Sequence, residues 1–299
     1  MLTVNVRGVL ICGLVVVPVF LAGCGEEQGR FEEAGSGRIA DDSVEASAPS
    51  SPIAESGVSP GMGRACESLA DDVWSLPRLV IDDSKEIITT DNNLLWLLGA
   101  AGGSIALRQG GGDDRIADNF DDHPWISTHK EWDKFTYYAG APGIHFAASG
   151  LWYLTAASNG DGTNKKNAWT MFEAVSVTGA ATMGLKLLIN DDTPNGKDLA
   201  WPSGHTSSSF AVASVLHDLY GPQVGIPAYL GAGFVGYRMM DAGDHWASDV
   251  LFGAVLGYMV GHHVAEKYHD IEVAGFNLIP YSTVHVDKPV MGLGFIKEF

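Results

Sequence analysis

Apolar residues recur at intervals of three and four along most of the chain from Cys66 to Tyr268. This periodicity places an apolar stripe on each of a series of helices, and each stripe must be buried against a neighbouring helix. A chain of 299 residues is long enough to bury a sizeable core. We therefore expect an all-α protein, a bundle of about six core helices, over residues 66–275.

The predicted elements follow one another with mostly short connections. The predicted helices cover residues 69–88, 92–108, 135–157, 165–189, 204–219, 226–240 and 245–268. Pro77 predicts either two short helices or one kinked helix, and Pro142 predicts a bend in the third helix. Residues 109–134 are a polar connector with room for one short helix. Residues 276–299 partly alternate between apolar and polar on either side of a turn, which predicts a tail or small β-hairpin.

The N-terminus has the pattern of an export signal. Arg7 precedes an apolar run over residues 8–21 that is short for a membrane span. The run ends in the sequence LAGC at residues 21–24, which resembles a bacterial lipobox. We therefore expect cleavage of a signal peptide over residues 1–23 and acylation of Cys24. An ordinary signal peptide, or an anchor helix with an incidental cysteine, is the alternative.

Composition narrows the partners of the chain. A formal charge of −18 excludes general nucleic-acid binding, which depends on cationic contacts to phosphate. Residues 24–65 are acidic and rich in Gly, Ser, Pro and Ala, which predicts a flexible tether to a membrane of the bacterial cell envelope. If Cys12 leaves with the signal peptide and Cys24 is acylated, Cys66 stands alone and no disulfide framework can form.

The sequence Pro202-Ser203-Gly204-His205 opens one of the predicted helices. Pro202 fixes the entry, Ser203 can cap the helix, and Gly204 lets the backbone approach a ligand closely. The free N–H groups and the dipole of the helix start favour an anion. His205 can protonate a leaving oxygen because its pKa ordinarily lies near neutrality. Alternatively, this is a capped helix start with an exposed histidine.

His245 and Asp249 stand four residues apart at the start of the last predicted helix. That spacing places both side chains on one helical face, or nearly so. A carboxylate bonded to one imidazole nitrogen fixes the tautomer and leaves the other nitrogen free to attack phosphorus. The alternative is a surface ion pair.

Lys186 and Arg238 each follow an apolar helical stretch in a chain with only 18 basic residues. A lysine in this position either extends its amine towards solvent or binds an anion. An arginine can bind two phosphate oxygens in a fork. Both side chains are therefore candidates for an anion site.

Three segments in this order, residues 186–194, 202–205 and 238–249, resemble the type 2 phosphatidic acid phosphatase superfamily. That superfamily shares its core with bacterial acid phosphatases and vanadium haloperoxidases. The resemblance covers residues 90–268.

The resemblance implies a role for each matched residue. His245 is expected to be the nucleophile that forms a phosphohistidine, Asp249 to orient it, and His205 to protonate the leaving group. It further implies that phosphate is held without a metal or other cofactor, by the side chains or backbone of Lys186, Ser203, Gly204 and Arg238.

The chain departs from the family pattern in the first segment and before the third. Thr193-Pro194 stands where the family has Arg-Pro, so one phosphate-binding arginine is missing, and Lys197 can replace it only as a point charge. Tyr237 replaces the serine that usually precedes the arginine of the third segment.

The interval between Arg238 and His245 has six residues, where the family usually has five. A bulged turn at Gly243 can absorb the added residue. Asp241 and Asp244 in this interval place negative charge beside the expected anion site.

These features predict a phosphatase that hydrolyses a phosphomonoester or pyrophosphate. The expected membrane tether points to a phosphorylated lipid as substrate. The alternatives are a vanadate-dependent haloperoxidase and a catalytically silent binding or structural lipoprotein of the same fold. Residues 135–157 are long and apolar enough to span a membrane, but they include His145, and a compact domain held at the membrane surface is our expectation.

Other chemistry-bearing residues predict no metal site. His262, His263 and His269 lack nearby cysteines or carboxylates at ligand spacing, and solvated helix-end residues account for them. The paired aspartates at 113–114, 121–122 and 191–192 lack the twelve-residue calcium-loop pattern.

Overall fold

The computed structural model describes residues 60–89, 93–126 and 128–268, and the backbone of three strands that follow. The expected signal peptide, the acylation site at Cys24 and the tether up to residue 59 lie outside the described residues.

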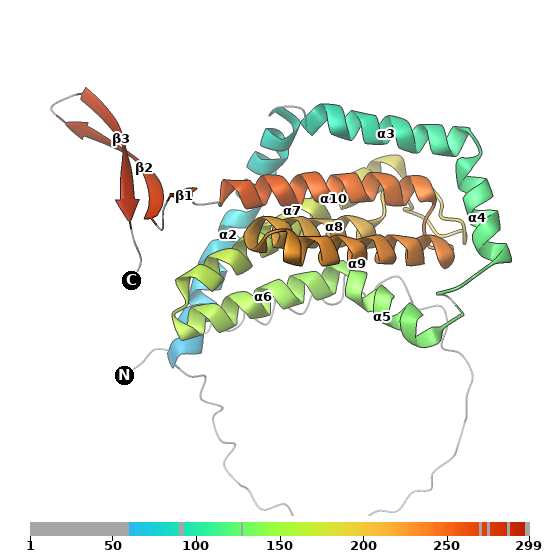
Figure 1. Ribbon diagram of the computed structural model, residues 1–299, viewed down its shortest axis with the longest axis horizontal. Helices are drawn as coiled ribbons and strands as arrows, with labels where there is room; N and C mark the ends of the chain where they lie inside the picture. Colours follow the sequence, from blue (N-terminus) through green and yellow to red (C-terminus); the bar gives the residue numbers. More distant parts are fainter. Residues whose placement is uncertain are drawn as a thin grey trace, which may run out of the picture.

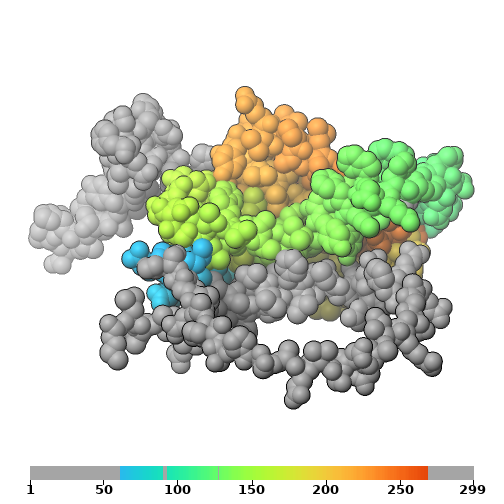
Figure 2. Space-filling model, turned by 90° about the horizontal axis from the view of Figure 1, so that it is seen from below, coloured from blue at the N-terminus to red at the C-terminus, as the bar shows by residue number. Residues whose placement is uncertain are grey.

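The described part up to Tyr268 is all helical, as predicted, with more helices than the expected six. The helices are α2 (Pro60–Thr89), α3 (Asn93–Gln109), α4 (Gly112–Asp122), α5 (Lys130–Gly140), α6 (Pro142–Asn159), α7 (Gly162–Ile189), α8 (Gly204–Tyr220), α9 (Pro222–Asp241) and α10 (Ala247–Lys267). In Figure 1, α8, α9 and α10 run side by side, α3 lies along one flank, and α4 and α5 lie at one end. Figure 2 shows α5 and α6 as a continuous face in front of α9.

Helices α8 and α10 approach each other closely because glycines on α10 face α8. Gly253, Gly257 and Gly261 follow one another at intervals of four. A Cβ atom on Gly253 would lie 2.8 Å from the carbonyl oxygen of Ser203, and one on Gly261 would lie 2.6 Å from that of Ala211. These distances leave no room for a side chain. The contact therefore fixes the start of α8 beside the start of α10.

The main core lies between α7, α8 and α10, with contributions from α2 and α3. Its buried residues are Ile87, Ala100, Met171, Ala174, Val175, Val177, Val215, Phe252, Leu256, Val260, Val264 and Ala265. Just before α8, the Trp201 ring packs on Phe252 with centroids 4.3 Å apart. Burying a large apolar side chain stabilises a fold by about 1.5–3 kcal/mol, so this packing anchors the segment that leads into α8.

The first described helix, α2, is longer than the predicted helix over residues 69–88. α2 runs without interruption through Pro77, and it begins at Pro60, six residues before the predicted start of the helical domain at residue 66. The last residues assigned to the tether are therefore helical. Ala65 in this first part of α2 is buried, so the helix continues as far as its packing extends.

The predicted bent helix over residues 135–157 is two separate helices. α5 ends at Gly140, and Ala141 has an extended backbone with φ −66° and ψ 123°. Pro142 then occupies the first turn of α6. The residue before a proline avoids helical dihedrals, and proline suits a helix start, so the chain breaks here instead of bending. The polar connector before α5 contains α4.

The last strands form a small antiparallel sheet in the order β1-β2-β3. β1 spans Ile271–Val273, β2 spans Phe276–His285 and β3 spans Lys288–Ile296. The pairing of β2 with β3 runs from Asn277 opposite Ile296 to His285 opposite Lys288. This pair is the hairpin that the alternating sequence predicts, and β1 is an addition to it.

Among the described residues, α7 is the helix that is long and apolar enough to cross a membrane by length and composition. In its most apolar window, 44% of the residues are buried inside the protein. The former candidate over residues 135–157 is divided between α5 and α6.

Candidate active site

Hydroxyl groups of its own residues cap the start of α8. Ser203 is the N-cap, and its Oγ accepts hydrogen bonds from the backbone N–H of Thr206 at 3.4 Å and from Thr206 Oγ1 at 3.0 Å. The Ser203 N–H donates to the carbonyl oxygen of Asp249 at 3.1 Å. The capping role expected of Ser203 is confirmed, and this bond joins the helix start to the first turn of α10.

His205 lies in the first turn of α8 and faces a small pocket. Its side chain is buried, and its Nε2 has no hydrogen-bond partner among the described residues. The ring packs against Tyr137 of α5, with centroids 5.0 Å apart. Burial, together with the neighbouring His245 and Arg238 side chains, lowers the pKa of His205 to about 3. The imidazole is therefore neutral at pH 7 and turned into the pocket.

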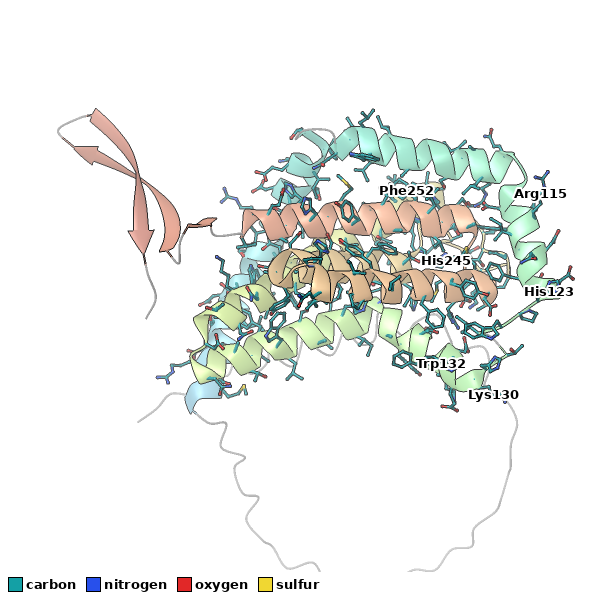
Figure 3. All side chains as sticks on the ribbon, in the orientation of Figure 1. Arg115, His123, Lys130, Trp132, His245 and Phe252 are labelled. Atoms are coloured by element: carbon teal, nitrogen blue, oxygen red, sulfur yellow. The ribbon has the colours of Figure 1, made fainter. Side chains whose placement is uncertain are left out.

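His245 precedes α10 and is held there by its backbone, whose N–H donates to the carbonyl oxygen of Met239 at 3.0 Å. Its Nδ1 lies 3.4 Å from Asp249 Oδ2, which also accepts the N–H of Trp246 at 2.9 Å. Asp249 is fully buried, and it caps the helix while it contacts the His245 ring. Figure 3 shows His245 at the α4 end of the bundle.

The pocket brings together residues from four distant segments. It has a cavity volume of about 20 Å³ and is lined by Tyr137, Thr193, Lys197, His205, Met239, Asp244 and His245. A cavity of this size holds roughly one water molecule. The two predicted histidines therefore share one pocket, with Asp249 behind one of them.

Arg238 reaches the pocket wall from the last turn of α9, and carboxylates surround its guanidinium. Its Nε donates to Asp133 Oδ1 at 2.8 Å, and its Nη1 donates to Asp244 Oδ2. The guanidinium also lies over the Tyr137 ring, 5.1 Å from the centroid. Asp133 and Asp244 therefore accept hydrogen bonds from the Arg238 donors that were predicted to bind phosphate.

Lys186 lies behind the start of α8 and does not line the pocket. Its Nζ donates to the carbonyl oxygens of Leu199 and, at 3.2 Å, of Ala200. Its Cε comes within 3.9 Å of the position that a Cβ on Gly204 would take. The lysine thus holds the 190–200 loop against the helix start that is expected to bind the anion.

Thr193, which replaces the family arginine, is used within the loop. Its Oγ1 donates to Asn195 Oδ1 at 2.6 Å and accepts the N–H of Lys197 at 2.9 Å. Lys197 lines the pocket as expected, with its Nζ 3.4 Å from Asp244 Oδ1. The replacement point charge is thus present, next to a carboxylate.

The interval between Arg238 and His245 contains a turn at Gly243. Gly243 takes a left-handed conformation with φ 66°, and its N–H donates to Met240 at 3.0 Å. Asp241 turns away from the pocket and accepts the N–H of Trp125 at 2.8 Å. Asp244 stays in the pocket wall. Although burial opposes its ionisation, the charges of Arg238, Lys197 and His245 hold the pKa of Asp244 below its usual range.

Sequence reasoning missed Arg108, in the last turn of α3. Its Nη2 donates to Asp191 at 2.6 Å, its Nη1 lies 3.6 Å from Asp249 Oδ1, and its guanidinium covers the Trp246 ring at 5.5 Å. It places a positive charge on the side of Asp249 away from His245. Its charge could have identified Arg108 as a candidate, because the chain has only 18 basic residues.

Sequence reasoning also missed Asp113 of α4, Asp133 and Tyr137. Asp113 is buried and accepts the N–H of Ser248 at 2.9 Å and its hydroxyl at 2.5 Å, which satisfies the start of α10. Asp133 and Tyr137 hold Arg238 from α5. No sequence pattern links these residues to the motifs, because the contacts join elements far apart in the chain.

Up to Tyr268 the described chain is all helical, with two histidines in one pocket at the end of the bundle. One of these histidines contacts an aspartate, and an arginine lies nearby. Residues 186–271 match the family model of the PAP2 superfamily, so this part of the chain is similar to that superfamily. The match includes Lys186, the start of α8, Arg238 and the His245–Asp249 pair. It excludes α2 to α6 and thus the α5 wall of the pocket.

One curated protein and two solved structures are similar to the chain. Lipid A 1-phosphatase of Porphyromonas gingivalis is 43% identical over 65 residues, which are 21% of this chain and 15% of that protein. The chain thus matches only a small part of the length of that relative. The crystal structure of Aquifex aeolicus LpxE has a TM-score of 0.44 and 18% identity, covering 52% of this chain and 94% of that one. A transmembrane PAP2 type phosphatidylglycerolphosphate phosphatase from Bacillus subtilis has a TM-score of 0.43 and 16% identity, covering 58% and 92%.

Proposed function

We propose that the chain is a phosphatase that cleaves a phosphate ester or anhydride through a phosphohistidine, without a metal. The observation that carries the proposal is that His205 and His245 line one pocket while Asp249 contacts the far nitrogen of His245. The family match over residues 186–271 and the 43% identity to a lipid A 1-phosphatase segment support it.

In the proposed reaction His245 Nε2 attacks phosphorus and the bond from phosphorus to the leaving oxygen breaks. Protonated His205 gives its proton to that oxygen. Water then attacks the phosphohistidine, loses its proton to His205, and releases phosphate. His205 must bind a proton for the first step, and the negative charge of a bound phosphate raises its pKa from the low value of the free protein.

Arg238 and the N–H groups at the start of α8 are proposed to hold the phosphoryl oxygens, and Lys186 joins them once its amine leaves the carbonyl oxygens of Leu199 and Ala200. The N-cap at Ser203 directs the free N–H groups of the first turn towards the anion. Arg238 must exchange Asp244 for a phosphate oxygen to do so. Charge on the equatorial oxygens is then neutralised in the transition state.

A lipid phosphate is the proposed substrate. Large apolar side chains are exposed on α3 and the end of α7: Leu94, Leu95, Trp96, Leu98, Ile105, Met183, Leu187, Leu188 and Ile189. Ile105 and Ile189 also line one shallow apolar pocket with Trp201, close to the start of α8. Such a surface suits acyl chains. Lipid A 1-phosphate, phosphatidylglycerolphosphate and isoprenoid pyrophosphates are the candidates to assay.

The location follows from the same proposal. Acylation of Cys24 after cleavage of a signal peptide would anchor the chain to a membrane of the cell envelope, since several acyl chains give stable binding where one is marginal. The tether would then hold the pocket near the lipid headgroups.

The test uses the full chain in detergent micelles with a phosphorylated lipid and a soluble phosphate ester, in the presence of a chelator. Release of inorganic phosphate is expected from the unmodified chain, and His245→Ala should reduce it at least a thousandfold, as loss of a nucleophile does on the order of 10⁴ or more elsewhere. His123→Gln, at an exposed histidine outside the pocket, is the matched control. Equal and negligible turnover of both variants and the parent would refute the proposal.

A catalytically silent binding protein is the second candidate, and the pairing of Arg238 with both Asp133 and Asp244 favours it. Trapping with a substrate labelled on phosphorus separates the two. The phosphatase predicts acid-labile label on the unmodified chain and none on His245→Ala. Bromide oxidation that depends on added vanadate would instead indicate a haloperoxidase.

A further inference from the structure

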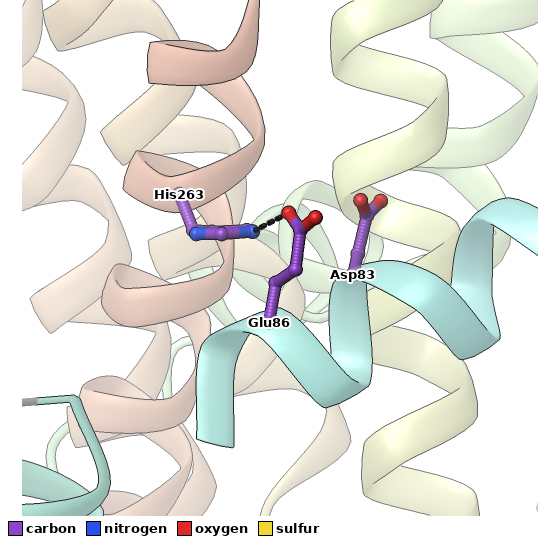
Figure 4. A group of neighbouring side chains, drawn as sticks. All are labelled: Asp83, Glu86 and His263. Atoms are coloured by element: carbon purple, nitrogen blue, oxygen red, sulfur yellow. Dashed lines mark ion pairs between the residues drawn. The ribbon is translucent and has the colours of Figure 1, made fainter. Parts of the chain in front are cut away.

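A second group of polar side chains lies between α2 and the C-terminal half of α10. Asp83 and Glu86 stand three residues apart on one face of α2, and His263 faces them from α10. Figure 4 shows the Glu86 carboxylate between the His263 ring and the Asp83 carboxylate. One ligand atom from each residue lies within 4.8 Å of those of the other two. Three side chains from two helices therefore converge on one point.

Two atoms in this group are buried without a hydrogen bond. Asp83 is only 1% exposed, and its Oδ1 accepts from Lys267 Nζ at 2.8 Å while its Oδ2 has no hydrogen-bond partner among the described residues. His263 Nε2 likewise lacks a hydrogen bond and lies 3.5 Å from Glu86 Oε2. A buried carboxylate oxygen without a hydrogen bond lowers the stability of the fold, so we expect Asp83 Oδ2 to have a further partner.

The surroundings carry more negative than positive charge. Glu173 of α7 is fully buried beside Asp83 and shares Lys267 with it, at 2.8 Å from the amine, while Tyr268 donates to its other oxygen at 2.6 Å. The Lys267 ammonium thus pairs with two buried carboxylates, while Glu86 faces His263.

We propose that Asp83, Glu86 and His263 bind a divalent transition-metal ion, of which Zn²⁺ fits best. One imidazole nitrogen and two carboxylate oxygens are a ligand set that zinc accepts, with water in the fourth position. Ligand atoms about 2.1 Å from a tetrahedral ion lie roughly 3.4 Å apart, and His263 Nε2 lies 3.5 Å from Glu86 Oε2. The ion supplies the partner that Asp83 Oδ2 lacks and offsets the excess of carboxylates.

The position of the site makes its role structural. His263 is sixteen residues beyond Ala247 at the start of α10, which is about 24 Å along the helix axis. An ion there touches neither His245 nor the pocket. It fastens α2, the first described helix, to the last helix of the bundle, and so links the segment that follows the N-terminal region to the core.

The test is zinc binding by the chelator-treated full chain in detergent micelles, measured by competition with a chromophoric chelator and by thermal unfolding with far-UV circular dichroism. We expect one zinc per chain at this site and a higher Tm with zinc, because a ligand that binds the folded state stabilises it. His263→Gln and Glu86→Gln should each weaken binding on the order of tenfold or more and remove the zinc-dependent rise in Tm.

His262→Gln is the matched control, since His262 is the adjacent residue but pairs with Asp218 and Glu266. It should bind zinc as tightly as the unmodified chain. Should His263→Gln fail to fold, Glu86→Gln decides, because that side chain is 60% exposed. The proposal is overturned if the unmodified chain binds no zinc, if both variants keep full affinity, or if His262→Gln loses it equally.

Discussion

At the scale of single residues, Asp244 is the pocket-lining carboxylate with the largest expected effect on anion binding. It lies between Arg238 and Lys197, accepts a hydrogen bond from Asn195 at 3.0 Å, and directly precedes His245. Under the proposed function, its carboxylate takes the place that a phosphate oxygen needs. The sequence identified this aspartate as electrostatically awkward, but only the structure shows which cations it holds.

Asp244→Asn should therefore tighten phosphate binding. Removing a negative charge next to an anion site, and releasing one arginine donor, should lower the inhibition constant for inorganic phosphate about tenfold. Competitive inhibition of ester hydrolysis measures this, and direct phosphate binding by calorimetry measures it if the chain has no turnover. Asp198→Asn, on an exposed residue of the 190–200 loop, makes the same change in net charge and should have little effect. Equal inhibition constants for all three chains would contradict the prediction.

The pKa of His205 predicts acid sensitivity of the fold. The pKa is about 3 in the folded chain against 6.5 for an ordinary histidine, so the unfolded state binds more protons between these values. Stability should therefore fall as the pH is lowered from about 6.5 towards 3. Urea unfolding at pH 7 and pH 5 should show a smaller loss of unfolding free energy for His205→Gln than for the unmodified chain. An identical loss would show that other groups account for the acid sensitivity.

The motif residues could be predicted because each acts within a few positions of its neighbours. Ser203 caps its own helix, and Asp249 contacts His245 four residues earlier. Asp133 and Arg108 could not be predicted, since they reach the site from α5 and α3 through contacts that depend on the packing of whole helices. Contacts between residues close in the sequence could therefore be predicted, whereas the contacts that reach the site from α3 and α5 could not.

At the scale of elements, apolar periodicity predicted α7 to α10 well and the region before them less well. α8 and α10 begin at residues with clear capping or loop chemistry. The split between α5 and α6 was predicted only as a bend, because the sequence does not reveal whether neighbouring helices would hold a bent helix together at Pro142. Packing decides that outcome.

Gly257→Ala should destabilise the fold through the contact between α8 and α10. A Cβ at this position would overlap the carbonyl oxygen of Ser207, so the helices must separate, and overpacking of this kind costs about 1–3 kcal/mol. Gly233→Ala on α9 is the matched control, because a Cβ there meets nothing within 4 Å. That change should stabilise the chain by about 0.5–1 kcal/mol. Urea unfolding of both variants measures the difference, and similar effects of both would contradict the close contact.

At the scale of the whole molecule, the exposed apolar side chains of α3 and α7 and the pocket lie on neighbouring parts of the surface. Arg108 and Ile189 line the same shallow pocket, and Arg108 also approaches Asp249. A lipid resting on this surface would have its headgroup close to Asp249 and His245. The proposed substrate class and the shape of the molecule therefore agree.

The double substitution Leu187→Ser and Leu188→Ser should lower turnover of a phosphorylated lipid in vesicles several-fold and leave a soluble phosphate ester unaffected. The two side chains are 66% and 80% exposed, and each contributes up to about 1.5–3 kcal/mol when buried in lipid. Vesicle co-sedimentation and phosphate release provide the measurements. Leu230→Ser, at a leucine of α9 that is 72% exposed, controls for the loss of an exposed leucine elsewhere. Equal losses on lipid and soluble substrates would indicate damage to the pocket instead.

The glycine contact between α8 and α10 has a consequence for how such a protein can diversify. The spacing of His205 and His245 is set by two backbones in direct contact, whereas part of the pocket wall comes from α5 and the 190–200 loop. Substitutions in those walls can accumulate without moving the two histidines. Under the proposed function, the part of the fold that holds the two histidines is therefore separate from the part in which substitutions would change the substrate.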